Sequence, residues 1–594
     1  MRNLLLILLS VGPLLVLAQT SYNFDFEEQD QQTRKSKNWF WGMGSSRSYR
    51  FSLDSINTYS GKYSTRIDNL VDGEKLSGAF HTSIPAVFTG KKIKLQGYIK
   101  TENVEGWTGL WMRIDGTREF INMNDQGLKG THDWKAYSIE LDLKEGAQDI
   151  VLGGLLKGRG VVWFDKLSVT IDGVDIAVAP KEDLTKYNPK PGEIEWLKNQ
   201  SVPLESVNAG NGFTDLQPLK SFVGDARIVS LGECTHGTSE VFKMKHRILE
   251  FLVTEMDFRI FSIEANMGEA QAINQYVLDG RGDPKSLLDT MYFWTWNTQE
   301  VLDMMVWMRS YNIKNPTKKL QFTGFDMQFG KGSADILSLF TKKYAPDMAL
   351  LTDSIASQVI RIQNRYSKAV EPVVFSMLET NLKSLGQFLE QNKFSISKKT
   401  GEREFEWIAH NITLLYQFKE LAKADRWGFG YSFRDKSMAE NVEWLLQKNP
   451  GQKIVLWAHN GHVKRQQNLM GGFLTDNGHR EDMRIIGFST GKGTYTAVKL
   501  GIGVSSNNVL VEPIAKTFEK HATAVGWQQF FIDTRKQNLN DKNADWISKR
   551  IGHRSIGARE MMSATQFSWG MLPDLYDAII YIDQTNASKC FKAK

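Results

Sequence analysis

The chain has 594 residues, of which 41% are hydrophobic and 24% are charged. This composition is ordinary for a globular protein, and the chain is too long to fold around a single core. Its net charge of +6, from 73 basic and 67 acidic residues, is small and spread along the chain, and it does not indicate a nucleic-acid partner. With only Cys234 and Cys590 present, a disulfide framework is excluded.

The first 18 residues are typical of a secretory signal peptide. Arg2 supplies a short basic region, residues 4–17 are mostly apolar, and Ala18 is a small residue before a cut at Gln19. The apolar run contains Ser, Gly and Pro and is too short for a membrane span, and no later segment reaches 18 consecutive apolar residues. We therefore expect a secreted or periplasmic protein with no membrane span.

Residues 19–172 are predicted to form an all-β domain. Short runs in which apolar and polar residues alternate predict strands at 50–53, 63–67, 92–100, 109–114, 134–141 and 161–170. The segments GKYSTRI, WKAYSIEL and GVVWFDKLSV resemble the galactose-binding-like jelly roll found in many carbohydrate-binding modules. The resemblance implies a β-sandwich, and it leaves open whether this domain has a structural role or contacts glycans. A proline-containing linker is expected at 173–193.

Beyond the linker, residues 194–588 alternate apolar strands with helical segments. Strands are predicted at 228–231, 259–263, 320–325, 453–457 and 484–488, with a last one at 576–583, and helices at 241–254, 268–278, 298–310 and 438–447. This alternation predicts an α/β/α domain with a mainly parallel sheet. Residues 352–391 and 402–423 are helical with no strand signal between them, so a helical insertion is expected from about 335 to 425.

Five of the predicted strands deliver polar side chains at their carboxyl ends. The first is followed by Glu233, Cys234, Thr235 and His236; the next three by Glu264 and Asn266, by Asp326 and Gln328, and by His459, Asn460 and His462; the fifth by Ser489, Thr490 and a predicted turn at Gly491-Lys492-Gly493. In open α/β sheets, ligands bind at this edge. Histidines and carboxylates gathered there favour catalysis or ligand binding over core packing.

The motifs along this edge resemble, in order and spacing, those of the erythromycin esterase family. They are GECTHG at 232–237, SIEAN at 262–266, GFDMQ at 324–328, RDKSMAENVEW at 434–444 and WAHNGHV at 457–463, and the similarity covers about residues 194–587. The resemblance implies a cofactor-free hydrolase of an ester or lactone, in which His236, Glu233, Glu264 and His459 activate water without a covalent enzyme intermediate. It also implies macrolide lactones as substrates, and with them antibiotic resistance.

His236 is the leading candidate for the general base. Neutral imidazole can take a proton from water at neutral pH, and Glu233 or Glu264 would orient the ring and stabilise its protonated form. His459 and His462 would bind the substrate carbonyl or hold the water, or else one of them only caps a turn.

Five further side chains are candidates for substrate binding or support. Arg434 would clamp a substrate oxygen or form a structural ion pair with Asp435, and Trp294 and Trp296 would line the cleft or pack in the core. Asp326 and Gln328 would fix the site loops by hydrogen bonds.

Three alternatives remain open at the level of sequence. Cys234, two residues from His236, is a rival nucleophile, although the neighbouring Glu233 disfavours a thiolate. The same His and Glu side chains could bind a metal, although neither an HExxH motif nor a cysteine cluster is present. A haem- or metal-binding protein on the same fold would use His459 and His462. For an enzyme, the partner is a small ester or lactone, which could be glycosylated.

Overall fold

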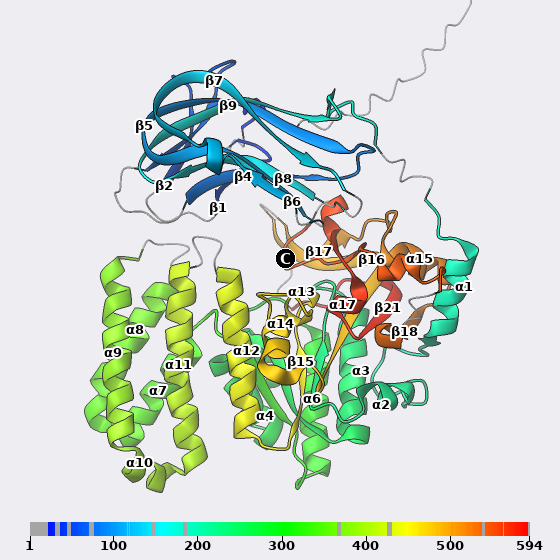
Figure 1. Ribbon diagram of the computed structural model, residues 1–594. Coiled ribbons are helices and arrows are strands. Elements are labelled where there is room, and N and C mark those ends of the chain that lie inside the picture. Colours follow the sequence, from blue (N-terminus) through cyan, green and yellow to red (C-terminus); the bar gives the residue numbers. More distant parts are fainter. Residues whose placement is uncertain are drawn as a thin grey trace, which may run out of the picture. The chain divides into compact units, whose positions relative to one another are not determined.

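The chain divides into two compact units, Met1–Glu182 and Asp183–Lys594, which are drawn in Figure 1. This computed structural model describes residues 22–29, 36–43, 49–69, 77–115, 117, 119–144, 147, 149–181, 187–364, 370–424, 430–499, 502–536, 541–561 and 563–591. The predicted signal peptide lies outside these residues. Among the helices that are described, none is long and apolar enough to cross a membrane.

The N-terminal unit is built of antiparallel strands. Its described strands are β1 (Phe40–Met43), β2 (Tyr49–Asp54), β3 (Ser64–Asn69), β4 (Ser77–Pro85), β5 (Lys92–Asp115), β6 (Glu119–Asn122), β7 (Leu128–Asp142), β8 (Asp149–Lys157), β9 (Gly160–Ile171) and β10 (Val174–Asp175). Strand β5 pairs with β7 and β9 along its first half and with β6 and β8 along its second. The two strands predicted at 92–100 and 109–114 are therefore one long strand. Side chains such as Phe80 and Phe164 fill a core that belongs to this unit alone.

The C-terminal unit contains a nine-stranded sheet in the order β11-β18-β21-β16-β12-β15-β13-β14, with β17 beside β16. The strands are β11 (Ser201–Pro203), β12 (Ile228–Leu231), β13 (Phe258–Asn266), β14 (Gln321–Asp326), β15 (Lys453–Trp457), β16 (Met483–Lys499), β17 (Gly503–Val509), β18 (Gln529–Asp533) and β21 (Ala578–Thr585). The six neighbouring strands β14, β13, β15, β12, β16 and β21 pair in parallel, whereas β11, β17 and β18 pair antiparallel. A separate hairpin joins β19 (Ile551–Arg554) to β20 (Phe567–Gly570).

Apolar layers cover both faces of this sheet. In β12, Val229 and Leu231 belong to one core cluster and Ile228 to the other, as expected when successive side chains of a strand point to opposite faces. The first layer includes residues of α2 (Pro218–Val223), α3 (Ser239–Met256), α4 (Met267–Asp279), α5 (Pro284–Asp289) and α6 (Gln299–Lys314). The second includes residues of α1 (Pro191–Gln200), α12 (Gly430–Lys448), α13 (Asn460–Val463), α14 (Met470–Leu474), α15 (Phe518–Val525), α16 (Asp545–Ser548) and α17 (Leu572–Leu575).

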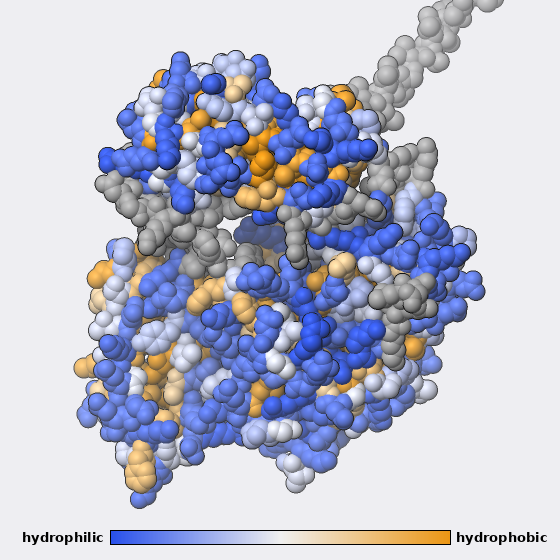
Figure 2. Space-filling model, viewed as in Figure 1, coloured by the Kyte–Doolittle hydropathy of each residue, from blue (hydrophilic) through white to orange (hydrophobic). Residues whose placement is uncertain are grey.

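The helical insertion has a core of its own. It consists of α7 (Lys331–Tyr344), α8 (Ala349–Gln363), α9 (Pro372–Gln391), α10 (Lys393–Thr400) and α11 (Glu402–Ala424). The segment 352–391, expected to be helical, contains α8 and α9, and α9 begins at Pro372, a residue that suits the first helical position but lacks the N–H that a helix interior needs. On the face seen in Figure 2, apolar residues reach the surface over these helices.

The turn predicted at Gly491-Lys492-Gly493 is also wrong, because β16 continues through it. Lys492 and Gly493 pair with Gln584 and Thr585 of β21. A Cβ atom on Gly493 would lie 1.9 Å from the carbonyl oxygen of Thr585, and the residue has a φ of +123°. Glycine is therefore present for a close approach of two strands rather than for a turn.

Candidate active site

The turn between β12 and α3 joins a carboxylate to an imidazole. Oε1 of Glu233 lies 2.7 Å from Nδ1 of His236, so Nδ1 carries the proton and donates it to the carboxylate. Glu233 is fully buried, whereas 12% of the His236 side chain is exposed. Nε2 of His236 has no hydrogen-bond partner among the described residues, and the ring lies near those of His459 and Trp296, with centroid distances of 4.8 and 6.1 Å.

Two side chains hold the other oxygen of Glu233. Nζ of Lys245 and Nε1 of Trp457 donate to Oε2 at 2.9 and 2.6 Å, and the Lys245 ammonium also lies 4.2 Å from the centre of a Trp457 ring. Burial alone would raise the pKa of Glu233, but Lys245 and His236 outweigh burial and lower it. Burial lowers the pKa of Lys245 to about 8, against the pull of Glu233. Glu233 is therefore an oriented anion.

Lys245 was missed in the sequence, although a signal was present. It lies four residues from Val241 and from Leu249, both buried on the core-facing side of α3. A lysine on the apolar face of a helix needs a buried anion. The strand-end carboxylate twelve positions earlier in the chain was available for that role.

His459 caps a short helix. Its Nδ1 accepts from the backbone N–H of Gly461 at 3.0 Å, and its Nε2 lies 3.1 Å from the carbonyl oxygen of Ile556, to which it donates. Burial lowers the pKa of His459 to about 3, helped by the neighbouring His236. Both ring nitrogens of this neutral side chain are thus in use, and the ring forms a wall beside His236.

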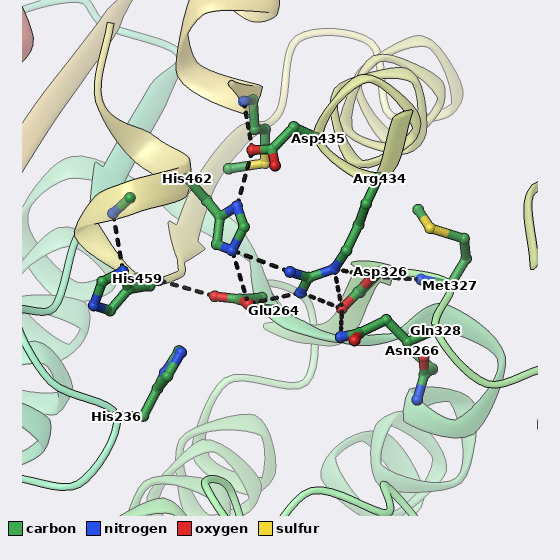
Figure 3. A network of polar contacts seen from close by, with 12 residues as sticks. His236, Glu264, Asn266, Asp326, Met327, Gln328, Arg434, Asp435, His459 and His462 are labelled. Carbon is green, nitrogen blue, oxygen red and sulfur yellow. Dashed lines mark hydrogen bonds and ion pairs between the residues drawn. The ribbon is translucent and has the colours of Figure 1, made fainter. Parts of the chain in front are cut away.

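Glu264, at the end of β13, lies in a dense charged network (Figure 3). Nη2 of Arg434 donates to Oε1 of Glu264 at 2.7 Å and to Oδ2 of Asp326 at 2.6 Å. The backbone N–H of His459 donates to Oε2 of Glu264 at 2.9 Å. Burial would raise the pKa of Glu264, but His462 and Arg434 lower it well below the usual range. Gln328 donates to Asp326 at 2.7 Å, so the two predicted supporting residues lie at this network.

His462 joins this network through two carboxylates. Its Nδ1 lies 2.9 Å from Oδ1 of Asp435, and its Nε2 lies 3.3 Å from Oε1 of Glu264. Burial would lower the pKa of His462, but Glu264 and Asp435 raise it to about 9, in spite of the nearby Arg434. The two carboxylates therefore favour the protonated form of His462, against Nη1 of Arg434, which lies 3.1 Å from Nε2 of the ring.

The ion pair expected between Arg434 and Asp435 is wrong. Arg434 pairs with Glu264 and Asp326, and Asp435 with His462. Both residues lie in the second turn of α12, where successive side chains point in different directions. Neighbours in sequence therefore bind different partners.

The tryptophans predicted to contact substrate lie in different surroundings. Trp296 is 1% exposed and belongs to the core, and its Nε1 donates to the carbonyl oxygen of Glu264 at 2.9 Å. Trp294 is half-buried, and its carbonyl oxygen lies 3.6 Å from Sγ of Cys590. Trp296 therefore supports the site from behind the catalytic edge.

Cys234 points away from the reaction centre. The side chain is fully buried, with Sγ 3.9 Å from Oγ1 of Thr490. Burial raises the pKa of its thiol to about 12. A thiolate nucleophile is therefore disfavoured at this position.

The arrangement offers one open ring nitrogen on His236 beside a charged network in which, among the described residues, Oδ2 of Asp435 is buried without a hydrogen-bond partner. Nε2 of His236 can accept a proton from water, while in the neighbouring network three carboxylates hold Arg434 and His462. Within the described ranges, no group of three or more His, Cys, Asp or Glu side chains is placed to hold a metal ion.

Comparison with known proteins identifies the family. The family model of erythromycin esterase matches residues 253–585. An erythromycin esterase type II from Escherichia coli is 26% identical over 385 residues, which cover 57% of this chain and 88% of that protein.

Two solved structures share the fold. A crystal structure of a Bacillus cereus protein has a TM-score of 0.61 and 26% identity, and the match covers 68% of this chain and 100% of that one. A mutant of the erythromycin esterase EreC in its open conformation has a TM-score of 0.51 and 20% identity, covering 64% of this chain and 96% of that one. The chain belongs to the erythromycin esterase family, whose members are hydrolases acting on ester bonds.

Proposed function

We propose that the protein is a secreted enzyme that hydrolyses a carboxylic ester or lactone with a water molecule activated by His236. One observation carries the proposal. Nδ1 of His236 is bound to the buried anion Glu233 at 2.7 Å, while Nε2 has no partner among the described residues. An imidazole held in this way has the tautomer and orientation of a general base.

The reaction proceeds by direct attack of water. Nε2 of His236 takes a proton as the water oxygen bonds to the substrate carbonyl carbon, and Glu233 stabilises the imidazolium that forms. His236 then returns the proton to the departing alkoxide as the ester bond breaks.

Labelled water tests this route. In water enriched in the heavy oxygen isotope, single turnover of a susceptible ester should place one labelled oxygen in the acid product. Intact-protein mass spectrometry during turnover should show no acyl adduct. A trapped acyl-enzyme that forms at the rate of turnover would contradict direct attack by water.

The substrate class is to be found by screening. A panel of macrocyclic lactones, acylated sugars and aryl esters should contain at least one compound that the wild-type chain hydrolyses. Failure of every ester together with hydrolysis of another bond type would contradict the proposed function.

Export is a separate part of the proposal and rests on residues 1–18. The mature protein recovered from outside the cytoplasm should begin at Gln19 by N-terminal sequencing. A mature protein that retains Met1 would contradict it.

A further inference from the structure

Three aromatic side chains gather beside the charged network without a part in the proposed reaction. The ring of Phe329, in the loop after β14, lies 5.4 Å from that of Tyr292 and 5.3 Å from that of Phe293. Tyr292 is 45% exposed, and the other two are half-buried. We call Tyr292, Phe293 and Phe329 the aromatic cluster.

Two buried polar side chains support the loop that carries Phe329. Oδ1 of Asn266 accepts from the backbone N–H of Phe329, and Oε1 of Glu269 accepts from that of Gly332, both at 2.9 Å. Asn266 occupies the N-cap position of α4, without a side-chain capping bond, and Glu269 lies in the first turn of the same helix. A Cβ atom on Gly332 would lie 2.6 Å from the backbone nitrogen of Glu269, so the starts of α4 and α7 meet here.

Each of these side chains keeps one polar atom without a partner. Nδ2 of Asn266 and Oε2 of Glu269 are buried and make no hydrogen bond within the described part of the chain, and the residues are only 1% and 6% exposed. In Figure 3 the amide nitrogen of Asn266 points away from Asp326 and Gln328. Unpaired buried polar atoms are costly and call for an explanation.

The two unpaired atoms are complementary to one hydroxyl group. An amide N–H donates and a carboxylate oxygen accepts, and a hydroxyl both accepts and donates. Burial raises the pKa of Glu269 to about 7, in spite of the nearby Lys331. The aromatic cluster adds apolar ring faces of the kind that line ligand sites around a few polar groups.

The cluster and the candidate active site lie on the same chain segments. Trp296, four residues after Tyr292, lies against His236 and donates to the carbonyl oxygen of Glu264. Asn266 follows Glu264 by two residues on β13 and is paired in register with Asp326 on β14. A substrate held at the aromatic cluster would therefore extend toward the catalytic histidine.

The geometry points to a substrate subsite for a hydroxylated ring, such as a sugar, formed by the aromatic cluster together with Asn266 and Glu269. A ring hydroxyl bridges Nδ2 of Asn266 and Oε2 of Glu269, and the apolar face of the ring packs on Tyr292 and Phe329. This inference rests on the proposed function, because it assigns part of the ester substrate.

Two acetates that differ in their ring hydroxyls test the subsite. One is methyl glucoside acetylated at its primary hydroxyl, and the other is cyclohexylmethyl acetate. The wild type should prefer the sugar acetate in kcat/KM. Glu269→Gln replaces one of the two carboxylate oxygens, Oε1 or Oε2, by an NH2 group that donates, and it should reduce that preference about tenfold. Tyr292→Leu should raise KM for the sugar acetate. Phe394→Ala, an 84% exposed position on α10, is the matched control and should keep the wild-type preference.

Binding without turnover separates this inference from the proposed function. Saturation-transfer NMR should detect methyl glucoside on the wild type and a weaker signal on Tyr292→Leu. If the wild type cleaves neither acetate yet binds the sugar through Tyr292, the subsite stands, and the wider ester panel decides the proposed function. The subsite is overturned if folded Glu269→Gln and Tyr292→Leu keep both the wild-type preference and the NMR signal. It is also overturned if the wild type cleaves both acetates without preference and shows no NMR signal.

Discussion

The candidate site has two halves, each built around a buried carboxylate at a strand end. The Glu233 half consists of Glu233, His236, Lys245 and Trp457, and the Glu264 half consists of Glu264, Asp326, Arg434, Asp435 and His462. In the Glu233 half, the chain of contacts ends at an open nitrogen of His236. In the Glu264 half, every charged group faces an opposite charge.

This difference separates the half that takes part in the reaction from the half that supports the structure. Buried charges persist only when opposite charges and hydrogen bonds compensate them, and the Glu264 half meets that condition with two cations and three carboxylates. A catalytic base instead needs one side that is held and one that is left for the reacting proton. We therefore expect the Glu233 half to determine turnover and the Glu264 half to determine stability and local charge.

The largest effect should follow from removing the open nitrogen. His236→Asn should reduce kcat by about a hundredfold to ten-thousandfold, the range that general-base catalysis contributes, with little change in unfolding. Steady-state kinetics and circular dichroism measure both. The control His132→Asn, at an exposed position in the N-terminal unit, should leave both kcat and unfolding unchanged. Near-wild-type turnover by folded His236→Asn would exclude it as the base.

Loss of the central cation should mainly destabilise the protein. Arg434→Met leaves Glu264 and Asp326 buried without their shared partner, and such a change costs about 3–5 kcal/mol of unfolding free energy. Denaturant titration should show this loss. In the control Arg361→Met, the exposed pair with Glu371 should cost less than about 1 kcal/mol. Equal losses in the two variants would refute the assignment of a structural role to the Glu264 half.

Much of the site's placement follows from residues that the sequence displays. The apolar run at β12 stops at Gly232, so Glu233 and His236 were expected at the sheet edge together with Glu264, His459 and His462, and the structure brings these five side chains together. Their individual environments were not predictable. The spacing of His459 and His462 allows either ring to cap a turn, and only the path of the chain after β15 decides that His459 does so.

The contacts that reach between distant elements escaped sequence reasoning for a physical reason. Lys245 and Trp457 meet at Glu233 only once α3 packs against the β12–β15 pair, and periodicity marks a buried face without naming what it faces. Arg434 was similarly separated from Asp435 by helix geometry. The division into a β-rich unit and an α/β unit was confirmed, because it depends on local patterns.

The protonated state of His462 should make stability depend on pH. Its folded pKa of about 9 lies above the ordinary value of 6.5, so its contribution is complete below pH 6.5 and is lost as pH rises through about 9. Over this window the wild type should lose about 2–3 kcal/mol more than His462→Gln. The pKa of Lys245 is lowered to about 8, so this side chain makes stability rise with pH. It does so in the wild type and in His462→Gln alike. Parallel stability curves for the two would show that His462 is neutral.

The smallest effect is expected at Cys234, which lies between Glu233 and His236 in sequence but does not share their chemistry. Its thiol is buried against Thr490 with a pKa raised to about 12, so Cys234→Ala removes one sulfur atom from the core and no reacting group. We expect kcat within twofold of wild type and a stability loss of about 1 kcal/mol. Cys590→Ala is the matched control for loss of a thiol. If Cys234→Ala instead loses as much activity as His236→Asn while remaining folded, the nucleophile is the thiolate, and His236 serves to activate sulfur rather than water.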